Sequence, residues 1–261
     1  MSGFPGLPDV DRQLFVPETV WVIEDGRFVE LSRAHAPDEW ERLVTSDGAI
    51  ATQVKDGMWP VSSSSAPSVM AQMIESLQLE PGMRVLEIGT GTGYNAACLT
   101  ALGAEVVSVE IDHEVAEHAR RALRVAGQPS VTVIAGDGEV GAPQYAPFDR
   151  VLATAAAHTV PYAWVEQTRA GGLVVVPWAA TFHPAGPLAV LVVREDGSAE
   201  GRFTAPVRFM PLRGQRLPQT VLHETEERWT AAGEPEACRY GVTVSAEGQR
   251  VWLDSPDSPV G

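Results

Sequence analysis

Cysteine is nearly absent from this chain of 261 residues. Only Cys98 and Cys238 occur, and neither belongs to a Cys-x-x-Cys pair. Two isolated cysteines make neither a zinc knuckle nor a disulfide framework. We therefore expect reduced thiols and no bound metal.

Long apolar runs are also missing. No stretch approaches the roughly 20 apolar residues that a membrane-spanning helix requires. The opening residues, from Met1 to Pro8, contain no basic region followed by an apolar core, so no secretory signal is predicted. These absences favour a cytoplasmic protein without a membrane partner.

Basic residues are few: 19 Lys and Arg stand against 34 Asp and Glu, which gives a formal net charge of −15. A field of that sign repels phosphate backbones, so nucleic acid is excluded as a partner unless a local basic patch exists. The nearest candidate patch is Arg120, Arg121 and Arg124, whose helical spacing is typical of a solvated helix face.

Hydrophobic residues make up 44% of the chain, which is enough for a sizeable core. The length fits one large α/β domain with appendages, or one domain with a small second one. We divide the chain into an N-terminal extension (1–60), a central domain (61–213) and a C-terminal extension (214–261). Short hairpins are predicted at 20–31 and 240–253, a helical stretch at 37–43, a charged helix at 224–228 and a tail from Asp254.

Apolar strands alternate with helical segments from Ser68 onward. The predicted strands cover 85–88, 106–109, 131–134, 148–152, 173–177, 187–193 and 203–209, and the predicted helices cover 69–77, 96–102, 114–126 and 162–168. This alternation is typical of a parallel sheet covered by helices on both faces. The predicted fold is α/β and Rossmann-like, with a doubly wound, mostly parallel sheet.

The loop after the first of these strands is rich in glycine. Gly89, Gly91 and Gly93 follow the strand and precede a helix, so the backbone can turn sharply and approach a ligand. A pyrophosphate-binding loop of the Gly-x-Gly-x-x-Gly type would need glycine where Tyr94 stands. Glu87 lies just before the loop, and an acid there suits the cationic amino-acid end of S-adenosylmethionine.

Two further acids end the next two strands. Glu110 could accept both ribose hydroxyls, and Asp137 could accept the adenine amino group. The carboxyl edge of an open α/β sheet is where ligands bind, so the three acids favour a methyltransferase of the Rossmann-like class I fold. Its predicted cofactor residues are Glu87, Gly89, Thr90, Gly91, Gly93, Glu110, Ile111, Asp137 and Gly138.

The loop after the fourth strand bears on the methyl acceptor. Enzymes that methylate exocyclic amines commonly carry an Asn/Asp-Pro-Pro-aromatic box there, whereas this chain has residues 153–157, Ala-Thr-Ala-Ala-Ala. No cysteine nucleophile stands there either, which disfavours carbon methylation of cytosine. These absences do not choose among oxygen acceptors.

Several motifs in order resemble the protein-L-isoaspartate O-methyltransferases. They are the glycine loop at 85–94, Gly-Asp-Gly at 136–138, residues 146–157, residues 171–177 and Phe-Met-Pro-Leu at 209–212. The resemblance covers roughly residues 60–213. It implies esterification of an aspartyl or isoaspartyl carboxylate of a peptide or protein, followed by succinimide formation.

The resemblance also implies an acceptor site. A Ser-x-Pro segment ahead of the first core helix meets the substrate in that family, and Ser65-Ala66-Pro67 matches it. Ser65 is the expected catalytic residue, and the implied substrate contacts are Ser64, Ser65, Ala155, Ala156 and His158. The competing interpretation makes residues 62–65, a run of four serines, a flexible linker, and a lone histidine such as His158 is more often structural.

The chain departs from compact members of the family at both ends, and residues 55–60 replace the usual glycine-rich lead-in. These departures bear on the substrate. Repair of isoaspartyl proteins and tailoring of a ribosomally made peptide at an aspartate both remain open. So do a small-molecule O-methyltransferase and a cofactor-binding protein without turnover.

Overall fold

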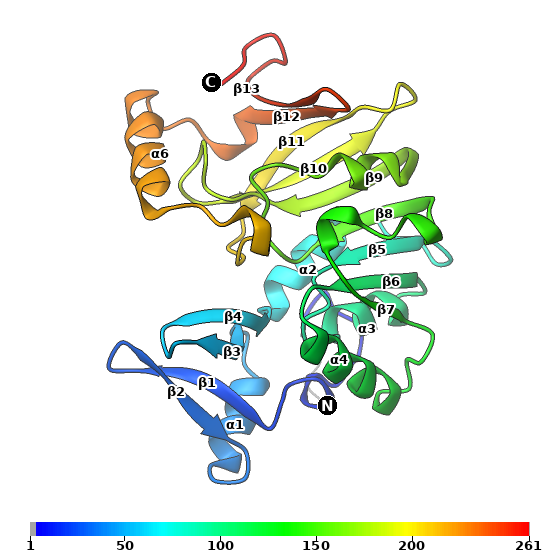
Figure 1. Cartoon of the computed structure of the whole chain (residues 1–261), viewed down its shortest axis with the longest axis vertical. Coiled ribbons are helices and arrows are strands. Elements are labelled where there is room, and N and C mark those ends of the chain that lie inside the picture. Colours follow the sequence, from blue (N-terminus) through cyan, green and yellow to red (C-terminus); the bar gives the residue numbers. More distant parts are fainter. Residues whose placement is uncertain (1–3, 261) are drawn as a thin grey trace. The chain divides into compact units, whose positions relative to one another are not determined.

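The computed structural model describes residues 4–260, so the extreme ends of the two predicted extensions lie outside the described residues. The chain forms two compact units. The first comprises the residues up to Met83 and Thr90–Gly136, and the second comprises Arg84–Gly89 and the residues from Asp137 onward. Figure 1 traces the elements of each unit along the chain. The three-part division made from the sequence stays a prediction.

The first unit begins with a four-stranded antiparallel sheet in the order β2-β1-β3-β4. Its elements are β1 (Thr19–Glu24), β2 (Arg27–Ser32), α1 (Pro37–Val44), β3 (Ile50–Lys55) and β4 (Trp59–Ser64). The predicted hairpin and short helix are confirmed, whereas β3 was missed. The linker interpretation of residues 62–65 is wrong, because β4 pairs with β3 and places Ser64 opposite Ile50 and Ser62 opposite Gln53.

A small hydrophobic core holds this sheet to α1. Trp40 is fully buried and packs with Val20, Val44 and Ile50. Its indole N–H donates to the carbonyl of Pro17 at 3.0 Å. The buried aromatic side chain therefore ties the helix both to the sheet and to the segment that precedes it.

The rest of the first unit is a parallel pair of strands with helices. It contains α2 (Pro67–Ser76), α3 (Tyr94–Ala101), β6 (Glu105–Glu110), α4 (His113–Val125) and β7 (Thr132–Ala135). In the β6–β7 pair, Glu110 lies opposite Ala135, at the carboxyl end of both strands. The amphipathic helix α4 begins where the Asp112 side chain accepts from the backbone N–H groups of Glu114 and Val115.

The second unit contains strands in the order β13-β12-β11-β10-β9-β8-β5. The bounds are β5 (Arg84–Ile88), β8 (Phe148–Ala153), α5 (Tyr162–Glu166), β9 (Thr168–Pro177), β10 (Pro187–Val193), β11 (Ala199–Pro206), α6 (Gln219–Ala231), β12 (Tyr240–Ser245) and β13 (Gly248–Leu253). The α/β class is confirmed. The sheet is mixed rather than mostly parallel, because β5, β8 and β9 pair in parallel and every pair from β9 to β13 is antiparallel.

The strand predicted at 203–209 is displaced. The structure has β11 at Ala199–Pro206, with Gly201 opposite Leu191 of β10. A Cβ at Gly201 would lie 1.8 Å from the carbonyl oxygen of Val190, so only glycine fits this close approach of two strands. The polar beginning of the strand, around Glu200 and Arg202, concealed it in the hydrophobic pattern.

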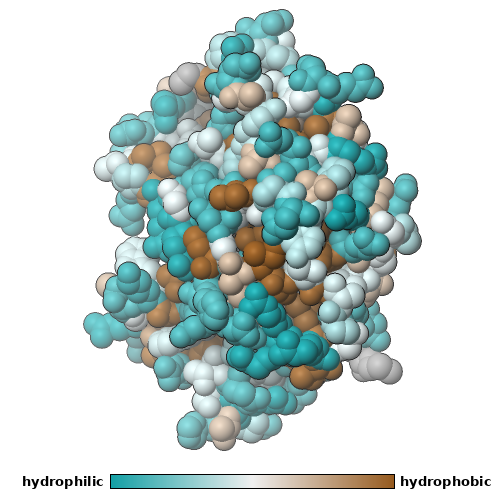
Figure 2. Space-filling model, turned by 45° about the vertical axis from the view of Figure 1, so that its right-hand side comes forward, coloured by the Kyte–Doolittle hydropathy of each residue, from teal (hydrophilic) through white to brown (hydrophobic). Residues whose placement is uncertain are grey.

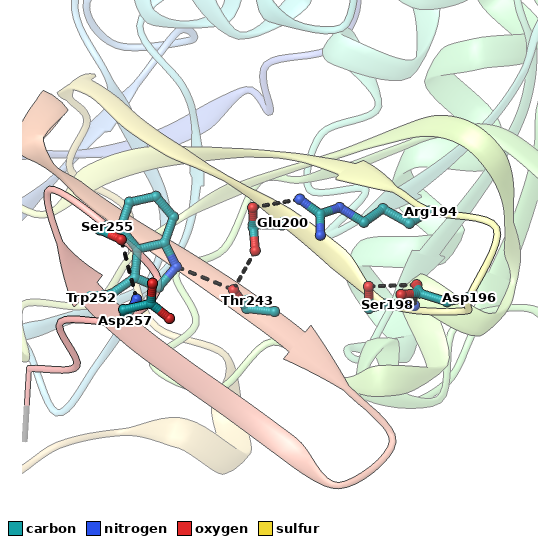
Figure 3. Close-up of polar contacts among 8 residues, drawn as sticks. All are labelled: Arg194, Asp196, Ser198, Glu200, Thr243, Trp252, Ser255 and Asp257. Carbon is teal, nitrogen blue, oxygen red and sulfur yellow. Dashed lines mark hydrogen bonds and ion pairs between the residues drawn. The ribbon is translucent and has the colours of Figure 1, made fainter.

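Polar contacts join the C-terminal strands, as Figure 3 shows. The Glu200 carboxylate of β11 pairs with Arg194 and accepts from the Thr243 hydroxyl of β12 at 2.8 Å. The Trp252 indole of β13 donates to the same hydroxyl at 3.2 Å. These contacts fix the register of three successive strands.

The prediction of a tail from Asp254 is wrong for the residues up to 260, because this segment pairs with β13. Pro259 lies opposite Trp252 in an antiparallel bridge, and the Val260 N–H donates to the carbonyl of Val251 at 2.9 Å. The segment after Asp254 therefore turns back along β13.

Figure 2 shows hydrophilic residues over most of the visible face, with smaller hydrophobic patches between them. Within residues 4–260, no helix combines the length and the apolar character needed to cross a membrane.

The Trp40 core gives a test of the N-terminal fold. We expect Trp40→Ala to lower the free energy of unfolding by about 3–5 kcal/mol, because it removes a fully buried indole and its hydrogen bond. Urea denaturation followed by circular dichroism measures this change. Trp59→Ala is the matched control, since Trp59 is 57% exposed, and an equal loss in both variants would contradict the packing role of Trp40.

Candidate functional site

The glycine turn adopts backbone conformations that side chains rarely tolerate. The φ angles of Gly91 and Gly93 are 53° and 88°, and Gly93 is the N-cap of α3. A Cβ at Gly93 would lie 3.3 Å from the Cβ of Ala119 on α4. In the second unit, Gly89 has a φ of 92°, and a Cβ there would lie 2.7 Å from Oγ1 of Thr154. At these positions both the backbone conformation and the close packing therefore require glycine.

Glu110 organises the turn from the end of β6. Its carboxylate accepts from the backbone N–H of Gly91 at 2.9 Å and from that of Asp112 at 3.0 Å. The residue is 8% exposed. Ile111, the next residue, is 43% exposed, so a buried carboxylate stands beside an open apolar side chain. Thr90 belongs to the same turn, and its hydroxyl hydrogen bonds to that of Ser108 at 2.6 Å.

The Glu110 carboxylate and the Ile111 side chain together fit the nucleoside end of S-adenosylmethionine. A ribose presents two hydroxyl donors, which a strand-end carboxylate such as Glu110 accepts, and an adenine ring needs an apolar wall such as Ile111. A small cavity of about 160 Å³ borders Gly91 and Thr92, with Thr52, Gln53 and His118 also in its lining. The glycine turn therefore borders open space in the first unit.

The second unit carries the other predicted cofactor residues. Glu87 is fully buried in β5. Asp137 caps a short 3-10 helix (Gly138–Val140) and accepts from the backbone N–H of Glu139 at 2.9 Å. A Cβ at Gly138 would lie 2.6 Å from Cγ2 of Ile88, so the turn presses against β5 at a position where only glycine fits. β5 and the Asp137 turn are thus neighbours.

The predicted acceptor residues of the second unit lie in the loop after β8. Ala156 is 3% exposed and bridges to Pro211, while Ala155 and His158 are half-buried. The Nδ1 atom of His158 lies 3.0 Å from the Thr159 hydroxyl. Small residues therefore line this loop, and the imidazole already has a local partner.

Gln215, which the sequence did not single out, fixes the backbone of this loop. Its side-chain oxygen accepts from the N–H groups of His158 and Thr159, both at 3.0 Å. Its amide nitrogen donates to the Glu139 carboxylate at 3.1 Å and to the carbonyl of Thr159 at 2.9 Å. One buried amide thus links the turn after Asp137 to the loop at His158.

The serine segment of the first unit alternates between two faces, as a strand requires. Ser62 and Ser64 are buried, and their hydroxyls contact Thr52 and Arg12, respectively. Ser63 and Ser65 are half-buried, and within residues 4–260 their hydroxyls have no hydrogen-bond partner. A Cβ at Gly91 would lie 3.4 Å from the carbonyl oxygen of Ser63, so the glycine turn passes beside the serine segment.

Arg12 holds the end of that segment in place. This side chain, 3% exposed, donates from Nε to the Ser64 hydroxyl at 3.2 Å and from Nη2 to the carbonyls of Ser64 at 3.2 Å and Ser65 at 2.9 Å. Three further acceptors are the carbonyls of Val44, Ser46 and Gly48. The guanidinium therefore joins the turn after α1 to the end of β4.

Burial lowers the pKa of Arg12 to about 10, so the group keeps its positive charge at neutral pH. No pattern in the sequence marks this residue, because its six acceptors are mostly backbone carbonyls from distant segments. Within residues 4–260, no group of three His, Cys, Asp or Glu side chains is arranged to hold a metal ion.

A family model for protein-L-isoaspartate(D-aspartate) O-methyltransferase matches residues 29–217. The chain is 43% identical over 152 residues to a protein-L-isoaspartate O-methyltransferase of Gloeobacter violaceus, covering 58% of this chain and 73% of that protein. It is 41% identical over 152 residues to one from Pyrococcus horikoshii, covering 58% of this chain and 69% of that protein.

Solved structures share the fold. A protein-L-isoaspartate O-methyltransferase superposes with a TM-score of 0.70 at 21% identity, covering 95% of this chain and 93% of that chain. A Plasmodium falciparum protein, solved in complex with S-adenosyl-L-homocysteine, superposes with a TM-score of 0.56 at 18% identity, covering 66% of this chain and 83% of that chain.

The contacts of Arg12 predict a large cost for its replacement. We expect Arg12→Lys to lower the free energy of unfolding by about 3 kcal/mol, because an ammonium cannot satisfy acceptors arranged around a planar fork and leaves buried carbonyls unpaired. Guanidinium chloride denaturation measures this difference. Arg42→Lys is the control, because Arg42 is exposed and bonds only within its own helix. Similar stabilities for the two variants would refute the role of Arg12.

Proposed function

The chain belongs to the protein-L-isoaspartate(D-aspartate) O-methyltransferase family, and we propose that it methylates the isoaspartyl carboxylate of a peptide or protein, with S-adenosylmethionine as methyl donor. The observation that carries this proposal is the approach of the Gly91 turn to the serine segment, where the Ser65 hydroxyl has no partner within the described residues. A donor turn and an acceptor wall thus meet in one unit.

The proposed cofactor residues divide according to the part of the ligand that each suits. Glu110 accepts from the ribose hydroxyls, Ile111 packs against the adenine, and Thr90, Gly91 and Gly93 let the backbone approach the ligand. In the second unit, Glu87 balances the cationic amino group and Gly89 begins the turn. Asp137 accepts from the adenine amino group at the turn that Gly138 continues.

The acceptor chemistry requires no general base. A carboxyl group has a pKa near 4, so an isoaspartyl side chain is already ionised at neutral pH. S-adenosylmethionine supplies an electrophilic methyl group on a sulfonium sulfur. The residues of the chain need only align the carboxylate oxygen with that carbon and exclude water.

Ser65 is the group proposed to orient the carboxylate, by donating a hydrogen bond from its hydroxyl. Ser64 contributes by holding this segment in place, because its buried hydroxyl and its carbonyl both accept from Arg12. Ala155 and Ala156 leave room for a peptide main chain, and His158 borders the same loop. The ester then forms a succinimide without further catalysis: the neighbouring backbone nitrogen attacks the ester carbonyl carbon, the bond to the methoxy group breaks, and the methoxy group leaves as methanol with the proton from nitrogen.

The proposed acceptor is isoaspartyl rather than aspartyl, on the strength of the relatives' names and their 40–43% identity. Methylation of an unmodified aspartate in a dedicated precursor peptide is tested by the same assay. Incubation with labelled S-adenosylmethionine and paired peptides, one isoaspartyl and one aspartyl, separates these acceptors. If neither peptide is labelled, the remaining alternatives are that the protein methylates a small molecule or that it binds the cofactor without turnover. A cytoplasmic location, and the absence of nucleic-acid, membrane and metal partners, stay predictions from composition.

The role of Glu110 predicts a specific loss of cofactor affinity. We expect Glu110→Gln to raise the Kd for S-adenosylmethionine at least about tenfold, because hydrogen bonds to a charged group contribute about 1.5–3 kcal/mol. Calorimetry measures the Kd, with circular dichroism as a check of folding. Glu105→Gln removes the same charge from the other end of β6 and should leave the Kd unchanged. Unchanged binding by a folded Glu110→Gln protein would refute the proposed ribose contact.

The role of Ser65 predicts a loss confined to the acceptor side. We expect Ser65→Ala to lower kcat/KM for an isoaspartyl peptide about 10- to 100-fold while the Kd for S-adenosylmethionine stays within about twofold, because only the bond to the acceptor carboxylate is lost. Ser63→Ala is the matched control, because Ser63 is likewise half-buried and two residues away in the same serine segment. Equal kcat/KM values for the two variants would contradict a specific contact by Ser65.

A further inference from the structure

A second pocket lies among the C-terminal elements of the second unit, and its lining contains none of the residues proposed to hold cofactor and acceptor. It measures about 540 Å³, and Phe203, Trp229, His183, Glu234, Glu236 and Cys238 contribute to its walls. Trp229 belongs to α6, which Figure 1 shows beside the C-terminal strands. The family match ends at residue 217, so Trp229, Glu234 and Glu236 lie beyond it.

The aromatic side of the pocket is held by a ring contact and by hydrogen bonds. The His183 and Trp229 rings meet edge to face, with centroids 5.2 Å apart. The Trp229 indole N–H donates to the carbonyl of Pro235 at 2.9 Å, and the Glu234 N–H donates to the carbonyl of Trp229 at 3.0 Å. The loop that carries both glutamates is therefore bonded to the tryptophan that they flank.

The acidic side of the pocket has no internal counter-charge. Glu234 and Glu236 are exposed, and within residues 4–260 neither forms an ion pair. The nearby Arg239 is committed to Asp254 in a two-point contact, with distances of 2.8 and 2.7 Å. Glu234 also adopts a φ of 54°, a conformation that costs energy for a residue other than glycine.

His183 supplies a further polar group at the pocket wall. It is 8% exposed, and its Nδ1 accepts from the Ala185 N–H at 3.2 Å. That bond leaves the proton on Nε2, for which the described residues supply no partner. Burial lowers the pKa of His183, so the imidazole is neutral and adds no positive charge at neutral pH. The pocket thus offers one donor, two carboxylates and an aromatic wall.

From these features we infer that the pocket binds a basic side chain of the peptide substrate, with the cation between the Trp229 ring and the carboxylates of Glu234 and Glu236. The aliphatic stem of an arginine or lysine covers the apolar floor at Phe203 and Pro206. A guanidinium or ammonium satisfies both carboxylates and the ring face. The Nε2–H of His183 suits a carbonyl of the same peptide. This assignment rests on the proposed function for the identity of the peptide.

Direct binding tests the pocket without using activity. The probe is the peptide acetyl-Gly-Arg-Gly-amide, compared with its citrulline counterpart, which has the same shape but no charge. The readout is the indole ¹H–¹⁵N signal of Trp229, assigned from its loss in Trp229→Phe. We expect the arginine peptide to shift this signal with an affinity at least tenfold above that of the citrulline peptide, and the difference to shrink as salt is raised.

Matched double variants make the test specific. Glu234→Gln with Glu236→Gln should abolish the preference for arginine, whereas Glu226→Gln with Glu227→Gln removes the same charge from exposed positions of α6 and should keep it. Circular dichroism confirms that both are folded. Equal shifts by the two peptides, or a preference that survives loss of Glu234 and Glu236, would overturn the assignment.

Methylation kinetics then connect the pocket to turnover. The substrates are isoaspartyl peptides in which a single arginine occupies each flanking position in turn. We expect arginine to lower the KM at least fivefold at one or more of these positions. This effect should be lost when Glu234 and Glu236 are replaced. A KM indifferent to arginine at every position would overturn the substrate role. If no isoaspartyl peptide is methylated, the proposed function fails instead, and the binding experiment still reports on the pocket.

Discussion

The segment proposed to meet the acceptor depends on one buried cation, the guanidinium of Arg12. The guanidinium of Arg12 binds six acceptors drawn from α1, the turn after it and the end of β4, and these include the hydroxyl of Ser64 and the carbonyl of Ser65. Because the bonds run to main-chain carbonyls, they set the path of the backbone at the point where β4 gives way to α2. The orientation of the Ser65 hydroxyl follows from that path, and so does the commitment of Ser64 to the interior.

The positive charge that Arg12 retains also bears on how the proposed site attracts a carboxylate substrate. A protein with a formal charge of −15 has little to attract a carboxylate substrate at long range. A guanidinium that stays protonated behind Ser64 and Ser65 orients two carbonyl dipoles and adds positive potential to the segment proposed to receive the carboxylate. The N-terminal extension is thus part of the proposed machinery of the protein.

Much of the fold could be read from the sequence, for identifiable physical reasons. The buried part of β9 at residues 173–177 is a continuous apolar run, and α4 shows a clean helical period, so their placement needed only the local sequence pattern. β3 was missed and β11 was misplaced because each mixes polar residues with apolar ones, and β11 depends on a glycine that lets two backbones approach. The pairing of the tail was not predicted, because it depends on a turn that brings Pro259 back opposite Trp252.

The candidate site likewise contains residues that the sequence pattern identified and residues that it did not. Glycines and acids at strand ends were recognisable because their chemistry is local, whereas Arg12 and Gln215 act through carbonyls and amides that are remote in sequence. The serine run was the instructive case. Composition alone allowed a flexible linker, but pairing with β3 turns it into a strand whose alternate serines have different environments.

The return of residues 258–260 along β13 has a consequence for how the protein behaves at high concentration. An outermost strand normally offers a row of unpaired N–H and C=O groups that can recruit a strand from another copy. Here Leu253 and Val251 of that strand already bond to Ser258 and Val260, and Pro259 has no N–H to offer a newcomer. The second half of this outermost strand is therefore covered by its own chain, which leaves fewer backbone groups for edge-to-edge association.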